Sequence, residues 1–525
     1  MKKKTYLKAI DESSAIISLN FCSEKFKSEF AKMLFLITII LTLLIIACAL
    51  TFAYINEKYK FFKSRNIAGP KPEFFFGNMR EAFFKRRHFS SIIDDFYQMY
   101  KDSEQIIGFY NITTPYYLLI SPEVIKQVLV KDFKHFRNNE FSGLSDKKKD
   151  PVMALNPFVM RDDEWKEKRT EVASGMTQNK LRSMFPLVQD VGKRFAEYLK
   201  EELKHNPSKC FDSREICVRY TCDTVSSCIF GIDGGSFTKK ESKIINMGNK
   251  MIRSISDAAK SFLPKRLMPQ DVQDFFVYLM EEAIKYRDSH SISRDDFLAH
   301  IISLKKKKEM SEIEMVAHGV TFFLDGFDTS SIGLAPIFYE LGKNKRVQSK
   351  LREELLAAFP NEEDFTYDKL LDHQYLENVI YESLRISPPI TFANRECSES
   401  ITLELNKRKI TIEKGDRIII PLISIQQDPE YYHDPKEFIP ERYDHGIKEY
   451  RDKGLLFPFG EGPRECLGKR FALLQVKTAI YSIVRNFEIS VNEELTAKNL
   501  EIDPEELLMN VKKGGMWLNF KDITC

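Results

Sequence analysis

A segment of 23 residues without a charged side chain, at positions 33–55, is the strongest constraint on how this sequence can fold. A helix rises about 1.5 Å per residue, so a helix of this length crosses a hydrocarbon layer of about 30 Å. A buried core helix and a cleaved signal peptide are the alternatives, and the segment is long for both of them. We therefore predict a transmembrane anchor at 33–55, which leaves residues 1–32 as an N-terminal extension.

The residues around the anchor bear on its orientation. Four basic residues follow it closely: Lys58, Lys60, Lys63 and Arg65. They favour a cytosolic body by the positive-inside tendency, but residues 1–32 also carry seven lysines against four acidic residues. Charge alone therefore leaves the orientation open.

Two prolines, Pro70 and Pro72, fix backbone angles, so we expect a stiff basic and proline-rich hinge at 56–78 and one large domain at 79–525.

Composition narrows the class of protein. The chain has 525 residues, 43% of them hydrophobic, which is enough for a large core. Its formal net charge of +3 argues against nucleic acid as a partner. The nine cysteines include no Cys-x-x-Cys pair, and their spacing fits neither a zinc finger nor a compact disulfide framework. We therefore expect reduced thiols and a body that faces the cytosol.

One cysteine, Cys466, lies in a loop rich in glycine and proline, just before an apolar segment of helix length at 467–487. Backbone N–H groups and the positive end of a helix both favour a thiolate at this place. The nearby glycines permit a tight turn and a close approach of the backbone to a flat or bulky group. Arg464 adds a positive charge two residues away. This combination suits a haem iron, with the arginine free to pair a propionate.

The pattern Phe459-x-x-Gly462-x-Arg464-x-Cys466-x-Gly468 matches the haem-binding signature of the cytochrome P-450 monooxygenases at every fixed position. The sequence resembles this family, in which a thiolate pushes electron density to the iron and favours O–O cleavage. For a short Arg-x-Cys-x-Gly segment alone, a turn with a buried, inert cysteine is the alternative. The resemblance implies haem b as cofactor, with Cys466 as the axial ligand of its iron.

The same resemblance implies a mainly α fold with a small β region, in which a long central helix lies over the haem. Ser311 and Glu314 form a capping box, from which an apolar helix is predicted to run to about Gly342. Segments that alternate or run apolar predict short strands at 116–120, 401–405, 409–413 and 417–420. The apolar residues at 258–268 fit either a contact with the bilayer or an ordinary helix contact.

Inside the long helix, residues 324–331 carry two carboxylates and three hydroxyls, which need partners in a buried helix. The segment resembles the family's oxygen-activation motif at four positions: Gly326, Asp328, Thr329 and Ser330. By this resemblance Asp328 and Thr329 pass protons, and Gly326 lies against the haem. Asp325 departs from the motif, since Ala or Gly is usual there; it could narrow the cavity, add a proton source or point away. Pro336 is a second departure and is predicted to kink the helix.

Three more residues resemble haem contacts of the family. Trp165 and Arg169 are four residues apart and share a helix face. In the family this spacing places both near a haem propionate, whereas an isolated pair is a common surface contact. Arg395 resembles a further propionate partner.

A second set resembles a structural element rather than a catalytic one. Glu382 and Arg385 share a helix face, and an exposed pair of this kind contributes only about 0.3–0.5 kcal/mol. In the family, however, the Glu-x-x-Arg motif joins a later Pro-Glu-Arg motif in a buried ion network behind the haem. By that resemblance Glu382, Arg385 and Arg442 form a structural triad.

The resemblance also implies partners and a location. Electrons from NADPH reach such an enzyme through NADPH–cytochrome P-450 reductase, and cytochrome b5 is a further candidate. Four lysines could meet an acidic reductase or could simply be solvated: Lys166, Lys168, Lys469 and Lys477. The implied location is the endoplasmic reticulum membrane, with the catalytic body in the cytosol. The anchor begins later than is usual in microsomal members.

Three functions stay open at this point. The first is a haem-thiolate monooxygenase that inserts one atom of O2 into a lipophilic small molecule. The residues within the motifs most resemble those of insect members of the drug-metabolising branch. This resemblance implies that the substrates are foreign compounds such as plant toxins or insecticides, with endogenous hormones or lipids as the alternative. The second is an isomerase or dehydratase of the same fold that does not use O2, and the third is a non-catalytic haem protein that senses a ligand.

Overall fold

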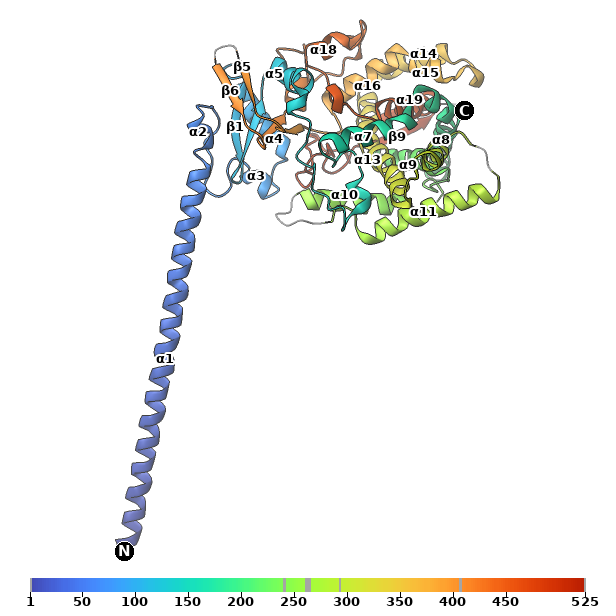
Figure 1. Cartoon of the computed structure of the whole chain (residues 1–525). Helices are drawn as coiled ribbons and strands as arrows, with labels where there is room; N and C mark the ends of the chain where they lie inside the picture. Colours follow the sequence, from blue (N-terminus) through green and yellow to red (C-terminus); the bar gives the residue numbers. More distant parts are fainter. Residues whose placement is uncertain (1, 239–241, 260–265, 292–293, 406–407, 524–525) are drawn as a thin grey trace.

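One long helix, α1 (Lys2–Lys58), projects from the body of the protein and carries the N-terminus far from it (Figure 1). The structure is a computed structural model of the whole chain. It describes all residues except 1, 239–241, 260–265, 292–293, 406–407 and 524–525, with the backbone alone at 2–25 and 258–259. Among the described residues one stretch, Phe26–Ser64, is long and apolar enough to cross a membrane, and it contains the predicted anchor at 33–55. Most of the segment 258–268 lies outside the described residues.

The body is mainly helical. Its first helices are α2 (Phe61–Ser64), α3 (Arg80–Phe83), α4 (Phe89–Tyr100), α5 (Pro122–Lys126), α6 (Pro151–Ala154), α7 (Asp162–Ala173), α8 (Gln178–His205), α9 (Ser213–Val225), α10 (Lys243–Ala259), α11 (Gln270–Ser289) and α12 (Phe297–Lys308). Its later helices are α13 (Glu312–Lys343), α14 (Lys345–Ala358), α15 (Tyr367–Leu371), α16 (Gln374–Ile386), α17 (Leu422–Gln426), α18 (Lys448–Asp452) and α19 (Lys469–Asn486).

Short strands form small sheets at two places in the body. The strands are β1 (Ile106–Asn111), β2 (Thr114–Leu119), β3 (Phe211–Asp212), β4 (Ala393–Glu396), β5 (Ile401–Leu405), β6 (Arg408–Ile412), β7 (Arg417–Ile420), β8 (Phe487–Val491) and β9 (Trp517–Asp522). One sheet has the order β1-β2-β7-β4, in which only β2 and β7 are parallel, with Tyr116 opposite Arg417. The others are β3-β9-β8 and the hairpin β5-β6. The predicted mainly α fold with a small β region is confirmed.

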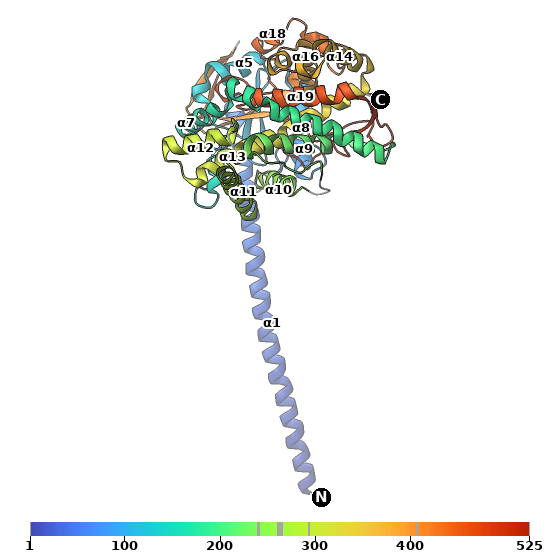
Figure 2. The same cartoon turned by 90° about the vertical axis from the view of Figure 1, so that its right-hand side faces the viewer.

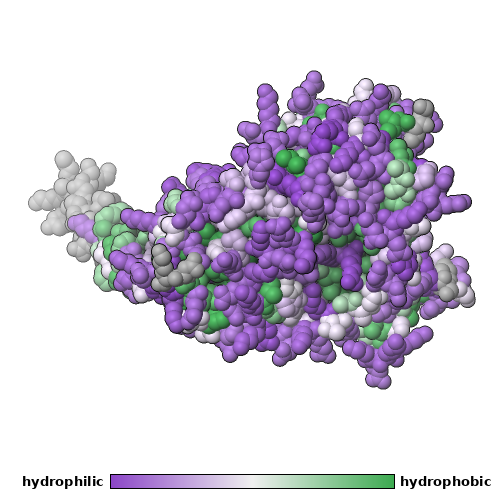
Figure 3. Space-filling model, turned by 90° about the horizontal axis from the view of Figure 1, so that it is seen from above, coloured by the Kyte–Doolittle hydropathy of each residue, from purple (hydrophilic) through white to green (hydrophobic). Residues whose placement is uncertain are grey.

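The longest helix of the body, α13, runs through its middle (Figure 2). Its start is the predicted capping box: Glu314 N donates to Ser311 Oγ at 3.2 Å, and Ser311 N donates to Glu314 Oε2 at 3.0 Å. The helix packs along α9 and touches α11, α12, α16 and α19. It is buried around most of its circumference, as expected for a helix inside a core. By contrast, the face of the body seen from above is largely hydrophilic (Figure 3).

The hinge does not stand free but docks on the first sheet. The Phe62 ring lies 5.2 Å from the rings of both Tyr110 and Tyr117. Phe62 N donates to the Tyr110 hydroxyl at 3.2 Å, and that hydroxyl donates to the Tyr59 carbonyl at 3.1 Å. A side chain at Gly108 would collide with the Phe62 ring, since its Cβ would fall 2.3 Å from a ring carbon. The end of α1 is therefore joined firmly to the body.

A buried charged cluster joins α7 to the N-terminal part of α13. Lys168 Nζ lies 2.9 Å from Glu171 Oε2, and His318 Nε2 lies 3.5 Å from Glu171 Oε1. Neither ring nitrogen of His318 has a hydrogen-bond partner among the described residues. Burial, and then the charge of Lys168, lowers the pKa of His318 to about 4. The folded protein therefore holds this imidazole neutral.

His318 gives the folded state a pH dependence. Its pKa is about 4 when folded, against about 6.5 in an unfolded chain, so the unfolded chain binds more protons between these values. The stabilising contribution is complete above about pH 6.5 and is lost as the pH falls towards 4, by up to about 3 kcal/mol. Chemical unfolding of the detergent-solubilised chain should show this decline, and His318→Gln should flatten it. Equal slopes for the two proteins over this range would contradict the assignment.

Candidate functional site

The loop around Cys466 is shaped by glycine and by one backbone bond. Cys466 N donates to the Phe459 carbonyl at 2.7 Å and so closes the loop just before α19. Gly462 has a φ of +73°, and a Cβ there would fall 2.0 Å from the Leu129 carbonyl oxygen, so only glycine fits. A Cβ at Gly468 would meet no atom within 4 Å, which leaves open space beside the sulfur. The loop can therefore accept a flat group against its backbone.

The Cys466 side chain is exposed to space inside the body rather than to the outer surface. Burial first, and then the Asp325 carboxyl, raises the pKa of the thiol to about 11. The Gly468 N–H and the Arg169 charge act in the opposite direction but do not outweigh them. The expectation that the helix end and Arg464 would favour a thiolate is therefore not met by the chain alone. A bound metal ion would supply the missing positive charge, because a coordinating thiol is deprotonated.

Three arginines predicted as haem contacts lie close together beside this loop. The Arg464 guanidinium lies 4.2 Å from the centre of the Trp165 ring, and that of Arg169 lies 5.9 Å from it. Arg169 Nη2 donates to the Glu465 carbonyl at 2.5 Å. Arg395 donates to the Asn394 carbonyl at 2.8 Å. The structure thus brings the motif loop together with residues from α7 and β4.

Nearby carboxyl groups compensate these arginines only in part: the Asp162 carboxyl acts on Arg464 and the Glu465 carboxyl acts on Arg169, but neither carboxyl forms an ion pair with its arginine. Among the described residues none of Arg169, Arg395 and Arg464 pairs with a carboxylate, and Nε of the last two has no hydrogen-bond partner. Burial lowers the pKa of Arg395 to about 10, and burial with the charges of the other two lowers that of Arg464 to about 9. Buried unpaired cations are costly. The cluster therefore fits a ligand that carries carboxylates, as the propionates of haem do.

The oxygen-activation motif on α13 presents its two carboxyls to different surroundings. Asp325 and Thr329, one turn apart, lie on the side open to the interior space, and the Thr329 hydroxyl donates to the Asp325 carbonyl. The Asp325 carboxyl acts on the Cys466 thiol, and burial raises its own pKa to about 7. Asp328 instead forms an ion pair with Arg214, with Oδ1 2.7 Å from Nη2. The Asp325 carboxyl is thus within electrostatic range of the Cys466 sulfur.

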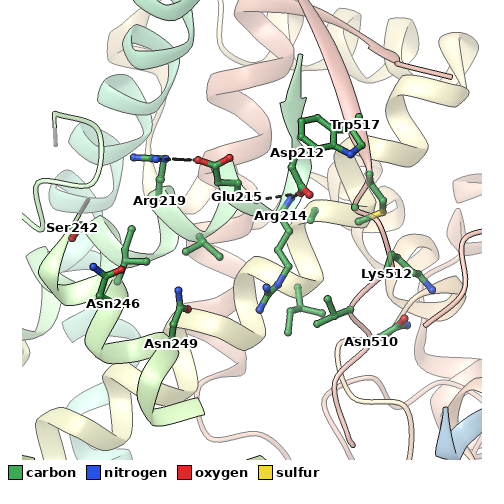
Figure 4. Close-up of a pocket in the computed structure, with 17 residues that line it drawn as sticks. Asp212, Arg214, Glu215, Arg219, Ser242, Asn246, Asn249, Asn510, Lys512 and Trp517 are labelled. Carbon is green, nitrogen blue, oxygen red and sulfur yellow. Dashed lines mark hydrogen bonds and ion pairs between the residues drawn. The ribbon is translucent and has the colours of Figure 1, made fainter. Parts of the chain in front are cut away.

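A cavity of about 470 Å³ lies beside the Asp328–Arg214 pair. Its walls come from α9, α10, α13 and the segment before β9, and Figure 4 shows Arg214 extending from α9 into the space between Asn249 and Asn510. The Arg214 side chain is 35% exposed, whereas that of Asp328 is 2% exposed. The arginine therefore connects a buried carboxylate to a space that water can enter.

The predicted triad lies together in the core. Arg385 Nε and Nη2 each donate to a different oxygen of Glu382 at 2.8 Å. Arg442 Nε donates to Glu382 Oε1 at 3.1 Å. Arg385 also donates to the carbonyls of Gln426 and Pro435, at 2.9 Å and 2.7 Å. Both side chains of the Glu382–Arg385 pair are fully buried, so their charges are compensated by each other and by fixed backbone dipoles.

The comparisons with known proteins agree with this geometry. The family model described as cytochrome P-450 matches residues 67–518. The chain belongs to the cytochrome P-450 family. It is 34% identical to probable cytochrome P-450 28d1 of Drosophila melanogaster, over 90% of this chain and 96% of that protein. It is 30% identical to cytochrome P-450 6A1 of Musca domestica, over 91% of this chain and 97% of that protein. The resemblance to insect P-450 proteins is confirmed.

Two of the four lysines proposed to meet a reductase are buried in this P-450. Lys477 is 1% exposed and pairs with Glu377 at 3.0 Å, and Lys168 is held by Glu171. The interpretation of these two as surface lysines was wrong, because charge pairs formed by folding cannot be seen in a helical pattern. Lys469 pairs with Glu465 at 2.7 Å, and Lys166 is exposed.

Two residues of the P-450 site were missed. Gln475 Nε2 donates to the Gly326 carbonyl at 3.1 Å and to Ser330 Oγ at 2.7 Å, which ties α19 to the motif on α13. An amide inside the apolar segment 467–487 was the available signal. Arg214 carried no such signal, because its partner is 114 residues away in the sequence.

Removal of one triad charge should be strongly destabilising in this P-450. Glu382→Ala leaves Arg385 buried without its carboxylate, so the free energy of unfolding should fall by about 3–5 kcal/mol. Glu404→Ala is the matched control, because Glu404 and Lys409 form a pair that is more than two-thirds exposed and should contribute less than about 1 kcal/mol. Equal losses in chemical unfolding of the two variants would contradict the structural role of Glu382.

Proposed function

We propose that this P-450 is a membrane-anchored haem-thiolate monooxygenase that inserts one atom of O2 into a lipophilic small molecule. The observation that carries the proposal is that Cys466 lies within electrostatic range of Asp325 on α13, beside three buried or half-buried arginines that form no ion pair with a carboxylate among the described residues: Arg169, Arg395 and Arg464. A candidate metal ligand therefore lies close to groups that can hold protons and to cations that can bind an anionic cofactor.

Haem b, when bound, supplies the redox and oxygen chemistry of the family, with electron density donated by a cysteine sulfur. In this chain Cys466 would bind its iron, and Arg169, Arg395 and Arg464 would pair its propionates, with the Trp165 ring centre 4.2 Å from the Arg464 guanidinium. These contacts neutralise cations that the protein otherwise compensates only in part. Binding of haem should therefore stabilise the arginines of the site, and the arginines should in turn hold the haem.

Protons reach the same place along α13. Arg214 lies at the edge of the cavity in Figure 4 and holds Asp328, so protons from water in that cavity can enter at this pair. On the other side of the helix, the Thr329 hydroxyl donates a hydrogen bond to the Asp325 carbonyl. The Asp325 carboxyl lies there too, and its raised pKa means that it holds its proton more firmly than an ordinary aspartate does. An enzyme that did not use O2 would have no need of this arrangement.

The remaining parts of the proposal rest on the family. NADPH provides the electrons through a flavoprotein reductase, for which the exposed Lys166 and Arg470 are candidate contacts. The body faces the cytosol at the endoplasmic reticulum membrane. The substrates are foreign compounds such as plant toxins or insecticides, and a screen for ligands that shift the haem spin state would identify them. Oxidation of an endogenous hormone or lipid would appear in the same screen.

Replacement of the cysteine ligand tests the reaction class. Cys466→Ser should abolish the reduced, CO-bound absorbance band of thiolate-ligated haem and all NADPH-dependent product formation with purified reductase. Cys210→Ser is the matched control, because Cys210 is half-buried and its sulfur lies between the Ser208 carbonyl and Asn492 Nδ2, outside the cysteine loop, and it should retain both signals. Survival of the band and of turnover in Cys466→Ser would exclude the proposed ligand. A normal band in the wild-type protein without NADPH consumption would instead favour a haem sensor or an isomerase.

Replacement of the groups that hold protons tests their role. Thr329→Ala and Asp325→Asn should each lower product formed per NADPH consumed by at least about tenfold, with hydrogen peroxide rising in proportion. Ser331→Ala is the control, since its hydroxyl is buried and donates to the Asp328 carbonyl at 2.7 Å. The haem spectra of all three variants should match the wild type. An unchanged product yield in Asp325→Asn would remove Asp325 from the pathway.

A further inference from the structure

The side chain of Gln475, on α19, spans one turn of the neighbouring helix α13. It is completely buried, and its Nε2 donates to the Gly326 carbonyl at 3.1 Å and to Ser330 Oγ at 2.7 Å. Residues 326 and 330 are four positions apart, which is slightly more than one helical turn. A single amide therefore holds both ends of the turn on which Asp328 and Thr329 lie.

Ser330 does not bond its own helix as the threonines of α13 do. Thr321 and Thr329 each donate to the carbonyl four residues back. The same bond from Ser330 would go to the Gly326 carbonyl, and it is not found among the described residues. Gln475 engages both of these groups instead. A hydroxyl that bonds back can bend a helix at its own position, whereas the shape of this turn is set by a donor from α19.

Packing fixes the backbone at the two ends of this bridge. The Tyr220 hydroxyl, from α9, donates to the Gln475 carbonyl at 2.8 Å, and Tyr220 is itself fully buried. A Cβ at Gly326 would fall 3.0 Å from Val225 Cγ1 on α9 and 3.5 Å from Phe471 Cε1 on α19. The backbone of α13 thus approaches both neighbouring helices closely at this residue, because glycine has no side chain there.

The bridge leaves one polar atom without a partner. Gln475 Oε1 is buried and accepts no hydrogen bond from the described residues. A buried acceptor without a partner is costly, and methionine, of similar length, would fill the same space without that cost. Stability alone therefore does not account for a glutamine at 475. The position that its amide gives to the turn of α13 does.

We propose that Gln475 is a positioning residue, which holds residues 326–330 so that Asp328 and Thr329 stay aligned during turnover. The inference rests on the proposed function. Coupled turnover converts substrate, O2, NADPH and one proton into hydroxylated product, water and NADP+. Without correct delivery of protons, the same O2, NADPH and proton yield hydrogen peroxide and NADP+. Gln475 thus determines the share of NADPH that ends in product, without touching the substrate.

Two glutamine-to-methionine variants of the full-length holoprotein separate positioning from stability. Gln475→Met removes both N–H donors and keeps nearly the same volume. Gln348→Met is the matched control, because Gln348 is 1% exposed and its Nε2 donates to the Leu341 carbonyl at 2.8 Å and to the Ile489 carbonyl at 3.0 Å. It bonds the same helix at its C-terminal end, away from the motif.

Product yield is measured with purified reductase and 7-ethoxycoumarin as the probe substrate. Gln475→Met should lower the product formed per NADPH consumed by at least about threefold, with hydrogen peroxide rising in proportion. Ser330→Ala, which loses one of the two bonds, should fall between this variant and the wild type. Gln348→Met should keep the wild-type yield, even though chemical unfolding shows a comparable loss of stability. The reduced, CO-bound absorbance band should be retained in all three variants.

Hydrogen exchange measured by mass spectrometry gives a readout apart from activity, whatever the substrate. Peptides that contain residues 326–330 should exchange at least about fivefold faster in Gln475→Met than in the wild type, and at the wild-type rate in Gln348→Met. An unchanged exchange rate or product yield in Gln475→Met would overturn the proposal, as would equal losses of yield in the two glutamine variants. A wild-type protein that consumes no NADPH with reductase would instead contradict the proposed function on which the inference rests.

Discussion

Incompletely compensated positive charge beside one cysteine is the condition on which the site of this P-450 depends. Arg169, Arg395 and Arg464 are packed around the loop of Cys466. The Glu465 and Asp162 carboxyls act on Arg169 and Arg464, but among the described residues none of the three arginines forms an ion pair with a carboxylate. Burial depresses the pKa of all three, and it raises the pKa of the thiol. A chain on its own gains nothing from such an arrangement. A group that brings carboxylates to the arginines and a metal ion to the sulfur relieves both strains at once.

The two sides of the central helix, α13, carry different polar groups. On one side Asp325 and Thr329 share space with Cys466, and on the other Asp328 is held by Arg214 beside a cavity open to water. The hydrogen bonds from Gln475 fix α13 against α19, the helix that follows the cysteine loop. The motif is therefore positioned relative to the helix that follows the cysteine loop.

Much of this could be predicted from the sequence, because the information was local. The capping box placed the start of α13, and the strands β5 and β7 occur at their predicted residues. The five fixed positions of the cysteine loop lie within ten residues of one another and can be read directly, although the reason for glycine at 462 is the distant Leu129 carbonyl. What could not be predicted depends on contacts between distant segments. The Arg214–Asp328 pair, the burial of Lys477 and the docking of Phe62 on β1 and β2 each need the finished fold.

X-ray absorption at the iron edge tests the central claim most directly, because it reports the atoms bound to the metal in the purified full-length protein. The account predicts one sulfur neighbour at about 2.3 Å, a usual metal–thiolate distance, together with the nitrogens of a porphyrin. A spectrum that requires only nitrogen and oxygen neighbours would show that the cysteine loop does not hold the metal, and the arrangement described around it would need another explanation.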